Sequence, residues 1–329
     1  NFNDLENSEI VINKINQVDI FKGVKHINFE DGIKDGSIEY ISQDVIEDYY
    51  KNVLAQGIHT ELVKDSGLKV VYTPLNGTGN KPVRTILDRI GIKNVTVVKE
   101  QENPDGNFPT CPFPNPEIRE ALNLGLQLCE TVKPDLLLAT DPDADRVGIA
   151  VPDENGNYVL FSGNEVGAML LEYICKERTA LGTMPKNPVA VKTIVTTDIC
   201  KKIAEEYGVE LREVLTGFKF IGEQIGLLEA DNQTDRYIFG FEESYGCLIG
   251  THARDKDAIV ATMALCEAAA YYKSKGMNLW DAMVDMYERY GYYKDDIKSI
   301  SLSGIEGLAK IQSILEALRQ NPPAEIGGY

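Results

Sequence analysis

Short apolar runs rich in β-branched residues alternate with segments of helical periodicity from Leu68 onward. Runs of this kind predict buried strands, and apolar positions three or four apart predict helices that pack on a sheet. In a first round, strands are expected over residues 68–73, 94–99, 134–140 and 146–151, and helices are expected to begin at the N-cap Asn80 and at Pro116. Alternation of strands with helices is typical of a layered α/β protein.

A second round begins near Pro188 and repeats the same order of elements. Strands are expected over residues 188–195, 209–215 and 236–241, and helices over 198–207 and 220–230. Each round places an acidic loop directly after its third strand, which indicates an internal structural repeat. Further helices are expected over 256–276 and 278–291, followed by a strand-like stretch at 297–304.

The predicted fold class is α/β, with two consecutive, structurally similar three-layer α/β/α domains whose mixed sheets are mostly parallel. We expect these domains to cover residues 45–163 and 164–300. Residues 1–44 would be the end of a preceding domain and its linker, and residues 301–329 a linker and the start of a following domain. The chain lacks an initiator Met and ends abruptly at PPAEIGGY, so we expect it to be a piece of a longer protein.

The composition is that of an ordinary globular protein, but the net charge is strongly negative. The 329 residues are enough for about two domains, and 43% are apolar and 26% charged, which excludes disordered, collagen-like and membrane-embedded classes. The 33 basic and 51 acidic residues give a net charge of −18. Nucleic acids and anionic membranes require an excess of Lys and Arg, so neither is expected as a partner. A small phosphorylated ligand is still compatible with this charge, since it needs only a local basic pocket.

The cysteine and histidine patterns bear on redox compartment and on metal chemistry. Six cysteines occur without any C-x-x-C pair, and the three histidines are not spaced as metal ligands. This favours free thiols in a reducing, cytoplasmic compartment and argues against a disulfide framework or a zinc centre. The first residues carry neither the basic stretch nor the apolar stretch of an export signal.

The strongest chemical signal is the acidic loop D-P-D-A-D-R, which follows the strand expected over 134–140. Its carboxylates, from Asp141, Asp143 and Asp145, stand at alternate positions and point the same way on an extended backbone. Three converging carboxylates repel one another unless a hard cation such as Mg²⁺ or Ca²⁺ neutralises them. An exposed acidic turn is the alternative. An EF-hand is excluded, because it needs Gly where Arg146 stands.

This loop resembles the metal-binding loop of the α-D-phosphohexomutases, the phosphoglucomutase/phosphomannomutase superfamily. Three further blocks agree with that family in order and spacing: T-G-F-K at 216–219, E-E-S-Y-G at 242–246 and R-D-K-D at 254–257. The E-E-S-Y-G form is the one associated with phosphoglucomutases. The blocks cover about residues 65–290, which the resemblance identifies as the second (45–163) and third (164–300) of four domains.

The resemblance implies a role for each block. Asp141, Asp143 and Asp145 would hold Mg²⁺ together with a phosphoserine. The catalytic residues would be Arg146 and Lys256, and the substrate-binding residues Thr216, Gly217, Lys219, Glu242, Ser244 and Arg254. These residue types suit the chemistry, because carboxylates accept hydrogen bonds from sugar hydroxyls, and phosphoryl transfer depends on positioning and on cations that neutralise phosphate charge.

Two features of the family are absent from the sequence. No serine is followed by His-Asn, as the family's phosphoserine loop requires, and no R-P-S-G-T phosphate clamp is found. The implied partners are therefore a phosphorylated hexose and the missing first and fourth domains, with glucose 1,6-bisphosphate as activator and intermediate of the whole enzyme. We expect this chain to fold without those domains but to be inactive by itself.

The function expected for the whole protein is that of a phosphoglucomutase, an isomerase that interconverts glucose 1-phosphate and glucose 6-phosphate. Phosphomannomutase is the alternative, since the E-x-S pair could serve either epimer. A Mg²⁺-dependent phosphatase with an aspartate nucleophile and a non-catalytic sugar-phosphate binding module are further alternatives. Without the resemblance, E-E-S-Y-G could be a solvated loop and Lys256 a member of a surface ion pair.

Overall fold

The computed structural model describes residues 5–295 and 302–325. Contacts divide the chain into two units, with the division after residue 293. Both sheets belong to the first unit, and the second unit carries helix α12 (Gly304–Gln320). The strand expected over 297–304 lies mostly outside the described residues, and α12 starts at its last residue. The domain limits expected at 163/164 and 300/301 stay predictions.

The first sheet has five strands in the order β2-β1-β3-β4-β5. Its strands are β1 (Lys69–Thr73), β2 (Asn94–Val97), β3 (Leu136–Thr140), β4 (Val147–Pro152) and β5 (Tyr158–Leu160). β1 pairs in parallel with β2 and β3, whereas β4 is antiparallel to both β3 and β5. All five residues of β3 are buried, as expected for a central strand that is covered on both faces.

Alternate residues of these strands enter two separate cores. Val71, Leu137 and Ala139 pack in a cluster with helix α6 (Asn123–Val132), which contacts β1 and β3. Val70 and Leu138 point to the other face and join the main core of the protein. Because side-chain direction alternates along a strand, this division shows that the sheet is the middle layer of three.

The second sheet has four strands in the order β7-β6-β8-β9. They are β6 (Val189–Thr193), β7 (Glu210–Val214), β8 (Tyr237–Phe241) and β9 (Cys247–Leu248). β6 pairs in parallel with β7 and β8, and β9 runs antiparallel to β8. In both sheets the second strand of the round lies at the edge and pairs with the first strand, and the third and fourth strands follow in that order. The predicted internal repeat and the predicted fold class are therefore confirmed.

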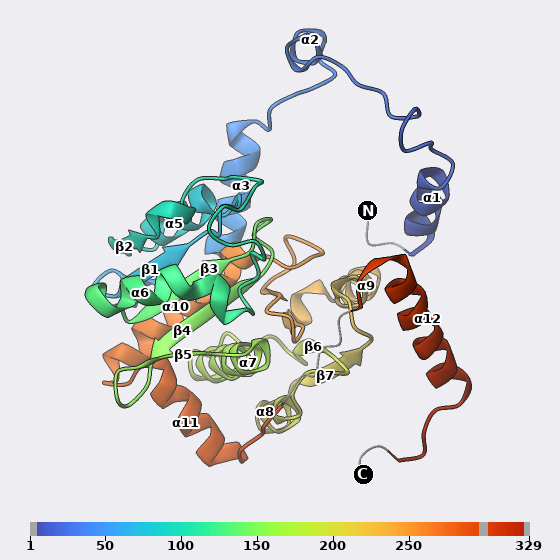
Figure 1. The fold of residues 1–329 in the computed structure, drawn as a ribbon. Helices are drawn as coiled ribbons and strands as arrows, with labels where there is room; N and C mark the ends of the chain where they lie inside the picture. The colour runs from blue at the N-terminus through green and yellow to red at the C-terminus, as the bar shows by residue number, and fades with distance from the viewer. Residues whose placement is uncertain (1–4, 296–301, 326–329) are drawn as a thin grey trace. The chain divides into compact units, whose positions relative to one another are not determined.

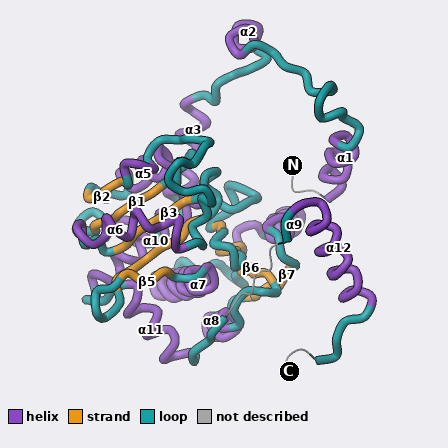
Figure 2. The backbone as a smooth tube through the Cα atoms, viewed as in Figure 1, coloured by secondary structure: helices purple, strands orange, loops and turns teal. Residues whose placement is uncertain are grey.

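The remaining elements are helices, coloured purple in Figure 2. They are α1 (Leu5–Ile15), α2 (Phe29–Asp35), α3 (Gln43–Leu54), α4 (Thr60–Val63), α5 (Asn80–Arg89), α7 (Gly163–Ala180), α8 (Ile199–Tyr207), α9 (Phe218–Ala230), α10 (Ala258–Ser274) and α11 (Leu279–Tyr290), with short 3₁₀ turns at Lys99–Gln101, Arg119–Leu122 and Thr234–Arg236. Among the helices of the described ranges, none is both long and apolar enough to cross a bilayer. All six cysteines are free thiols, as predicted, and the structure shows that all six are buried.

Three expectations about local structure were wrong or incomplete. Asn80 is the first residue of α5 rather than its N-cap, which is Gly79. Pro116 does not open a helix, because its backbone packs against β4 and α6 begins only at Asn123. The 18-residue helix α7 and the short strand β5 were not predicted. The capping box of α7, in which Ser162 and Glu165 bond each other's backbone N–H, is a sequence signal that could have revealed this helix.

Two helices pack on elements of the round that they do not follow along the chain. α7 follows the first sheet along the chain but contacts β8 and α8 of the second round. α10 follows the second sheet but contacts β3, β4, α4 and α5 of the first round, and Figure 1 shows it in orange beside the green strands. Residues of both sheets consequently share one buried core. The two similar rounds thus lie in one compact unit.

The contact between α7 and β8 depends on Gly167, and this generates a stability prediction. A Cβ at this position would lie 2.1 Å from Cδ2 of the buried Phe241 ring. We expect Gly167→Ala to lower the free energy of unfolding by about 1–3 kcal/mol, because the ring or the helix must move. Chemical denaturation followed by circular dichroism measures this change.

Gly226 in α9 is the matched control, since a Cβ there meets nothing within 4 Å. Gly226→Ala should raise stability by up to about 1 kcal/mol through helix propensity alone. Equal effects of the two substitutions would show that the packing at Phe241 is not what Gly167 provides.

Candidate active site

The two acidic loops occupy equivalent places in the repeat. Residues 141–146 connect β3 to β4, and residues 242–246 connect β8 to β9. Each loop is closed by a backbone hydrogen bond, from Asp141 N–H to Arg146 O (3.3 Å) and from Glu242 N–H to Gly246 O (2.9 Å). Each therefore places a buried carboxylate directly after the third strand of its sheet.

The loops also contact each other. Arg146 and Gly246 form an antiparallel bridge, and Val147 N–H donates to Tyr245 O at 3.2 Å. The first residue of α7 supports this junction, because a Cβ on Gly163 would lie 2.0 Å from Glu243 O. Backbone interactions thus bring the predicted metal loop and the predicted sugar loop into one site.

The three aspartates converge, as the sequence predicts. One carboxylate oxygen from each of Asp141, Asp143 and Asp145 lies within 4.8 Å of the others. Asp141 Oδ1 accepts hydrogen bonds from the N–H groups of Asp145 (3.0 Å) and Arg146 (2.9 Å), which fixes the curve of the loop. Asp145 Oδ1 is buried and accepts no hydrogen bond. Converging anionic oxygens with one buried atom unsatisfied fit a hard divalent cation such as Mg²⁺.

The electrostatics of the loop also fit a cation. The pKa of Asp141 is raised to about 7: burial is the largest cause, the hydrogen bond from the Arg146 N–H opposes it, and the charges of Asp145 and Asp143 add to the rise. Ionisation of the Asp141 carboxyl is therefore costly in this loop. A bound dication would offset that cost.

The loop that follows β1, the parallel neighbour of β3, supports the predicted metal loop by contacting Pro142. Thr78 donates both its N–H (2.8 Å) and its hydroxyl (3.0 Å) to Pro142 O. A Cβ on Gly77 would lie 2.3 Å from Pro142 Cα, so only glycine permits this approach. The N-G-T-G segment at 76–79 is thus a structural support that the sequence analysis did not identify.

The predicted sugar-binding pair, Glu242 and Ser244, lies at the same junction. Ser244 Oγ donates to Glu242 Oε1 at 3.0 Å. Burial raises the pKa of Glu242, and the positive charge of Lys256 lowers it. The pair presents an acceptor and a hydroxyl side by side, an arrangement that suits a polyol.

Lys256 joins the two loops by charge. Its Nζ lies 3.0 Å from Asp145 Oδ2 and 3.9 Å from Glu242 Oε1, and it also pairs with Asp255. Its side chain is only 12% exposed, so the alternative of a simple surface ion pair is wrong. Nζ also lies 5.6 Å from the ring centre of Phe218, within the T-G-F-K block.

The backbone after Lys256 is tied to both loops. Asp257 N–H donates to Cys247 O (2.9 Å) and Ala258 N–H donates to Ala144 O (3.1 Å). The Asp257 carboxylate caps α10 and accepts hydrogen bonds from the hydroxyl of Tyr49 (3.0 Å) and from His252 Nε2 (2.7 Å). His252 thus has a structural role, because it holds the residue that caps α10.

The other predicted substrate residues lie at the start of α9 or beside it. Gly217, with φ of 119°, precedes α9, and Lys219 is exposed with Nζ 5.0 Å from the Phe220 ring centre. Thr216 is also exposed. Arg254 Nη1 donates to Thr251 O (2.7 Å), and Nη2 pairs with Glu229 of α9 (2.7 Å). The substrate roles of these residues stay predictions.

Two glutamates that the sequence analysis did not select contact this site. Arg146 Nη1 donates to Glu117 Oε1 at 3.3 Å, and Thr193 Oγ1 donates to Glu243 Oε2 at 2.8 Å. Glu117 belongs to the proline-rich segment before α6, and Glu243 to the sugar loop itself. The position of Glu243 inside the E-E-S-Y-G block is a sequence signal that could have indicated it. Glu117 has no such signal, because it is 29 residues from Arg146.

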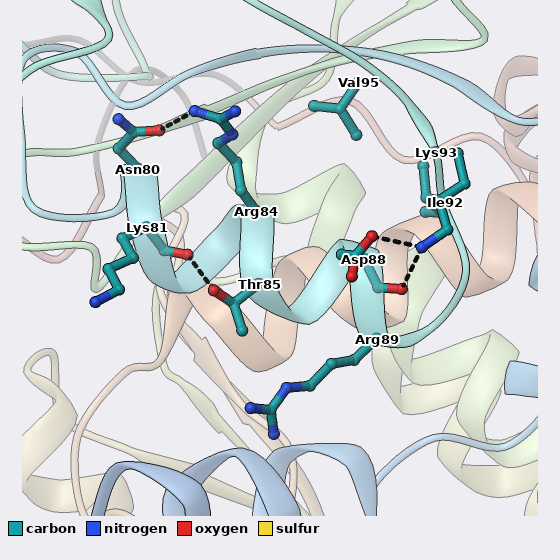
Figure 3. Close-up of a pocket in the computed structure, with 9 residues that line it drawn as sticks. All are labelled: Asn80, Lys81, Arg84, Thr85, Asp88, Arg89, Ile92, Lys93 and Val95. Atoms are coloured by element: carbon teal, nitrogen blue, oxygen red, sulfur yellow. Dashed lines mark hydrogen bonds and ion pairs between the residues drawn. The ribbon is translucent and has the colours of Figure 1, made fainter. Parts of the chain in front are cut away.

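A separate hollow of about 700 Å³ lies along α5 and is lined by the residues drawn in Figure 3. It contains several basic side chains in an otherwise acidic protein. Arg84 pairs with Glu102 (2.8 Å) and Arg89 with Glu47 (2.8 Å), so these charges are already balanced within the protein. We therefore do not assign the hollow to the active site.

Comparison with known proteins gives one family. Residues 47–156 match the family model described as phosphoglucomutase/phosphomannomutase, alpha/beta/alpha domain II, and residues 162–290 match domain III of the same family. A phosphoglucomutase of Staphylococcus aureus (strain bovine RF122 / ET3-1) is 38% identical over 291 residues, covering 88% of this chain and 51% of the relative. A phosphoglucomutase of Staphylococcus epidermidis (strain ATCC 12228) is 36% identical, covering 88% and 52%. The chain thus spans about half the length of the curated relatives it matches.

Solved structures show the same fold at lower identity. The parafusin phosphoglucomutase of Paramecium is similar with a TM-score of 0.56 and 20% identity, covering 75% of this chain and 42% of that one. A phosphoglucomutase/phosphomannomutase family protein of Burkholderia thailandensis gives a TM-score of 0.54 and 17% identity, covering 74% and 48%. These likenesses support the two-sheet architecture described above.

The geometry of the aspartate loop generates a prediction about metal binding. Asp143→Asn should raise the Mg²⁺ dissociation constant of this chain by about tenfold or more, since one anionic ligand of three is lost. The fold should survive, because Asp143 is exposed and the substitution relieves repulsion. Isothermal titration with MgCl₂, together with circular dichroism, measures both properties.

Glu154→Gln is the matched control for net charge, since Glu154 is an exposed acid outside the cluster. It should leave the dissociation constant unchanged. An Asp143→Asn variant that binds Mg²⁺ as tightly as the unsubstituted chain would remove Asp143 from the metal site.

Proposed function

Because the chain belongs to the phosphoglucomutase/phosphomannomutase family, we propose that it forms the metal- and sugar-binding part of a phosphoglucomutase. The observation that carries this proposal is the junction of the two loops. Lys256 Nζ lies 3.0 Å from Asp145 in the aspartate loop and 3.9 Å from Glu242 in the sugar loop. A phosphate held at the metal and a sugar held at Glu242 would therefore share one cation.

The substrate class is a phosphorylated hexose, with glucose preferred. Glu242 and Ser244 would bind the sugar hydroxyls, and Thr216, Gly217, Lys219 and Arg254 would lie around the sugar phosphate. The form E-E-S-Y-G and the similarity to staphylococcal phosphoglucomutases support glucose. Phosphomannomutase is the second candidate, because an acceptor beside a hydroxyl can bind either epimer.

The cofactor would be Mg²⁺, held by Asp141, Asp143 and Asp145. When bound, it would neutralise negative charge on the phosphoryl group, as hard cations do in phosphoryl-transfer enzymes. Arg146 and Lys256 would add two positive charges in a protein whose net charge is −18. The Lys256 side chain is largely buried and that of Arg146 is partly exposed, so solvent screens the charge of Lys256 less.

The reaction of the whole protein would be transfer from a phosphoserine outside this chain. The P–O bond to serine breaks, a new P–O bond forms to a sugar hydroxyl oxygen, and the hydroxyl proton passes to the serine oxygen. The resulting glucose 1,6-bisphosphate then returns its other phosphoryl group to serine by the reverse exchange. The residues of this chain would hold the hexose and its phosphate in place, which is the larger part of catalysis in such a reaction. Family membership argues against a phosphatase with an aspartate nucleophile.

The direct test is a coupled assay on the complete protein and on this chain. With glucose 1-phosphate, Mg²⁺ and glucose 1,6-bisphosphate, the complete protein should form glucose 6-phosphate. This chain alone should not, because it has no serine in the family's phosphoserine sequence. Faster turnover of mannose 1-phosphate would favour the second candidate, and activity with neither sugar would contradict the proposal.

Sugar recognition by Glu242 gives a second prediction. In the complete protein, Glu242→Gln should lower kcat/KM for glucose 1-phosphate by about 10- to 100-fold, since a hydrogen bond to a charged acceptor contributes roughly 1.5–3 kcal/mol. The Mg²⁺ dissociation constant should change much less. Glu223→Gln, at an exposed position of α9, is the control. Parallel losses of both properties would indicate instead that Glu242 binds the metal or maintains the fold.

A further inference from the structure

The side chain of Arg146 lies among three carboxylates, whereas its backbone is fixed. Its N–H donates to Asp141 Oδ1, and the residue bridges to Gly246. The guanidinium Nε lies 3.7 Å from Asp141 Oδ2 and 3.6 Å from Asp145 Oδ1, while Nη1 donates to Glu117 Oε1 at 3.3 Å. The backbone of Arg146 is therefore held in place, and only its guanidinium can shift between Asp141, Asp145 and Glu117.

Two of the three acids are the proposed metal ligands. A guanidinium that pairs closely with Asp141 and Asp145 would satisfy the oxygens that a divalent cation needs. It would also place a positive charge where the cation must bind, and that repulsion is strong in a partly buried site. A third acid that holds the guanidinium would limit both effects.

The segment that carries Glu117 is built to present it at this point. Glu117 N–H donates to Asn115 Oδ1 at 2.9 Å, which fixes the turn before it. Pro116 lies directly on β4, because a Cβ on Gly148 would be 2.8 Å from Pro116 O. Gly148 stands two residues after Arg146, on the same face of the strand. Packing of Pro116 on Gly148 thus sets Glu117 beside the arginine.

We propose that Glu117 is a positioning residue whose hydrogen bond keeps the Arg146 guanidinium beyond hydrogen-bonding distance of Asp141 and Asp145, so that the oxygens of both carboxylates can bind a divalent cation. This inference rests on the proposed metal site. It assigns a role to the proline-rich segment before α6, which contributes an acid to the site from outside either loop.

The test is a double-mutant cycle with Glu117→Gln and Arg146→Gln on this chain, with Mg²⁺ and Mn²⁺ dissociation constants measured by isothermal titration. Glu117→Gln alone should raise both constants by about three- to tenfold, because the freed guanidinium turns to the aspartates. In the Arg146→Gln background, the same substitution should change neither constant. Glu120→Gln, an exposed acid three residues away, should have no effect in either background.

The cycle separates positioning from simple charge. If Glu117 assisted the cation only through its negative charge, Glu117→Gln would weaken binding equally in both backgrounds, and the inference would be overturned. An unchanged dissociation constant in the Glu117→Gln variant would overturn it as well.

A second measurement does not depend on the metal. The ¹⁵Nε–H resonance of Arg146, identified by its loss in Arg146→Gln, should shift in the metal-free Glu117→Gln variant, because the guanidinium changes partners. If the unsubstituted chain binds neither metal and this resonance shifts, the metal site fails while the placement of Arg146 by Glu117 stands. A resonance that does not move overturns the inference, whatever the metal does.

Discussion

One ammonium group connects the parts of this site. Lys256 Nζ pairs with Asp145 of the first acidic loop and lies near Glu242 of the second. The next two residues repeat the connection through the backbone, to Cys247 and to Ala144. In a chain with 18 more acidic than basic residues, this local balance of charge allows two carboxylate-rich loops to lie in contact. Removal of the charge would leave buried acids from both sheets without their shared partner.

The strands and the chemistry of the loops could be predicted from sequence because both are local. Apolar runs such as L-L-L-A-T at 136–140 have to be covered on both faces. The three aspartates are close enough in sequence to converge, but they do so in a turn, with Ala144 at φ 59°, and not on the extended backbone that was predicted. The repeat could be predicted for the same reason, because the order of strands and helices follows from the sequence pattern. The observed order of the strands in the two sheets agrees with it.

The missed features depend on distant partners. Pro116 has the sequence context of a helix start, but its packing on Gly148 keeps the backbone out of a helix. Glu117 gains its place through that packing and through the hydrogen bond of its N–H to Asn115 Oδ1. Arg254 is next to the site in sequence, yet its guanidinium is bound to Thr251 O and Glu229. In each case a tertiary contact overrides what the neighbouring residues prefer, and a single sequence does not reveal such contacts.

The packing of α7 and α10 on the other round has a consequence for the order of events during synthesis. The strands of the first sheet are complete at Leu160, but α10, which packs on β3 and β4, begins only at Ala258. At ribosomal rates of about 5–20 residues per second, this gap amounts to roughly 5–20 s. During that interval one apolar face of the nascent first sheet lacks part of its permanent cover, since α5 is already present but α10 is not. We expect chaperones that bind nascent chains to cover that face until α10 has been synthesised.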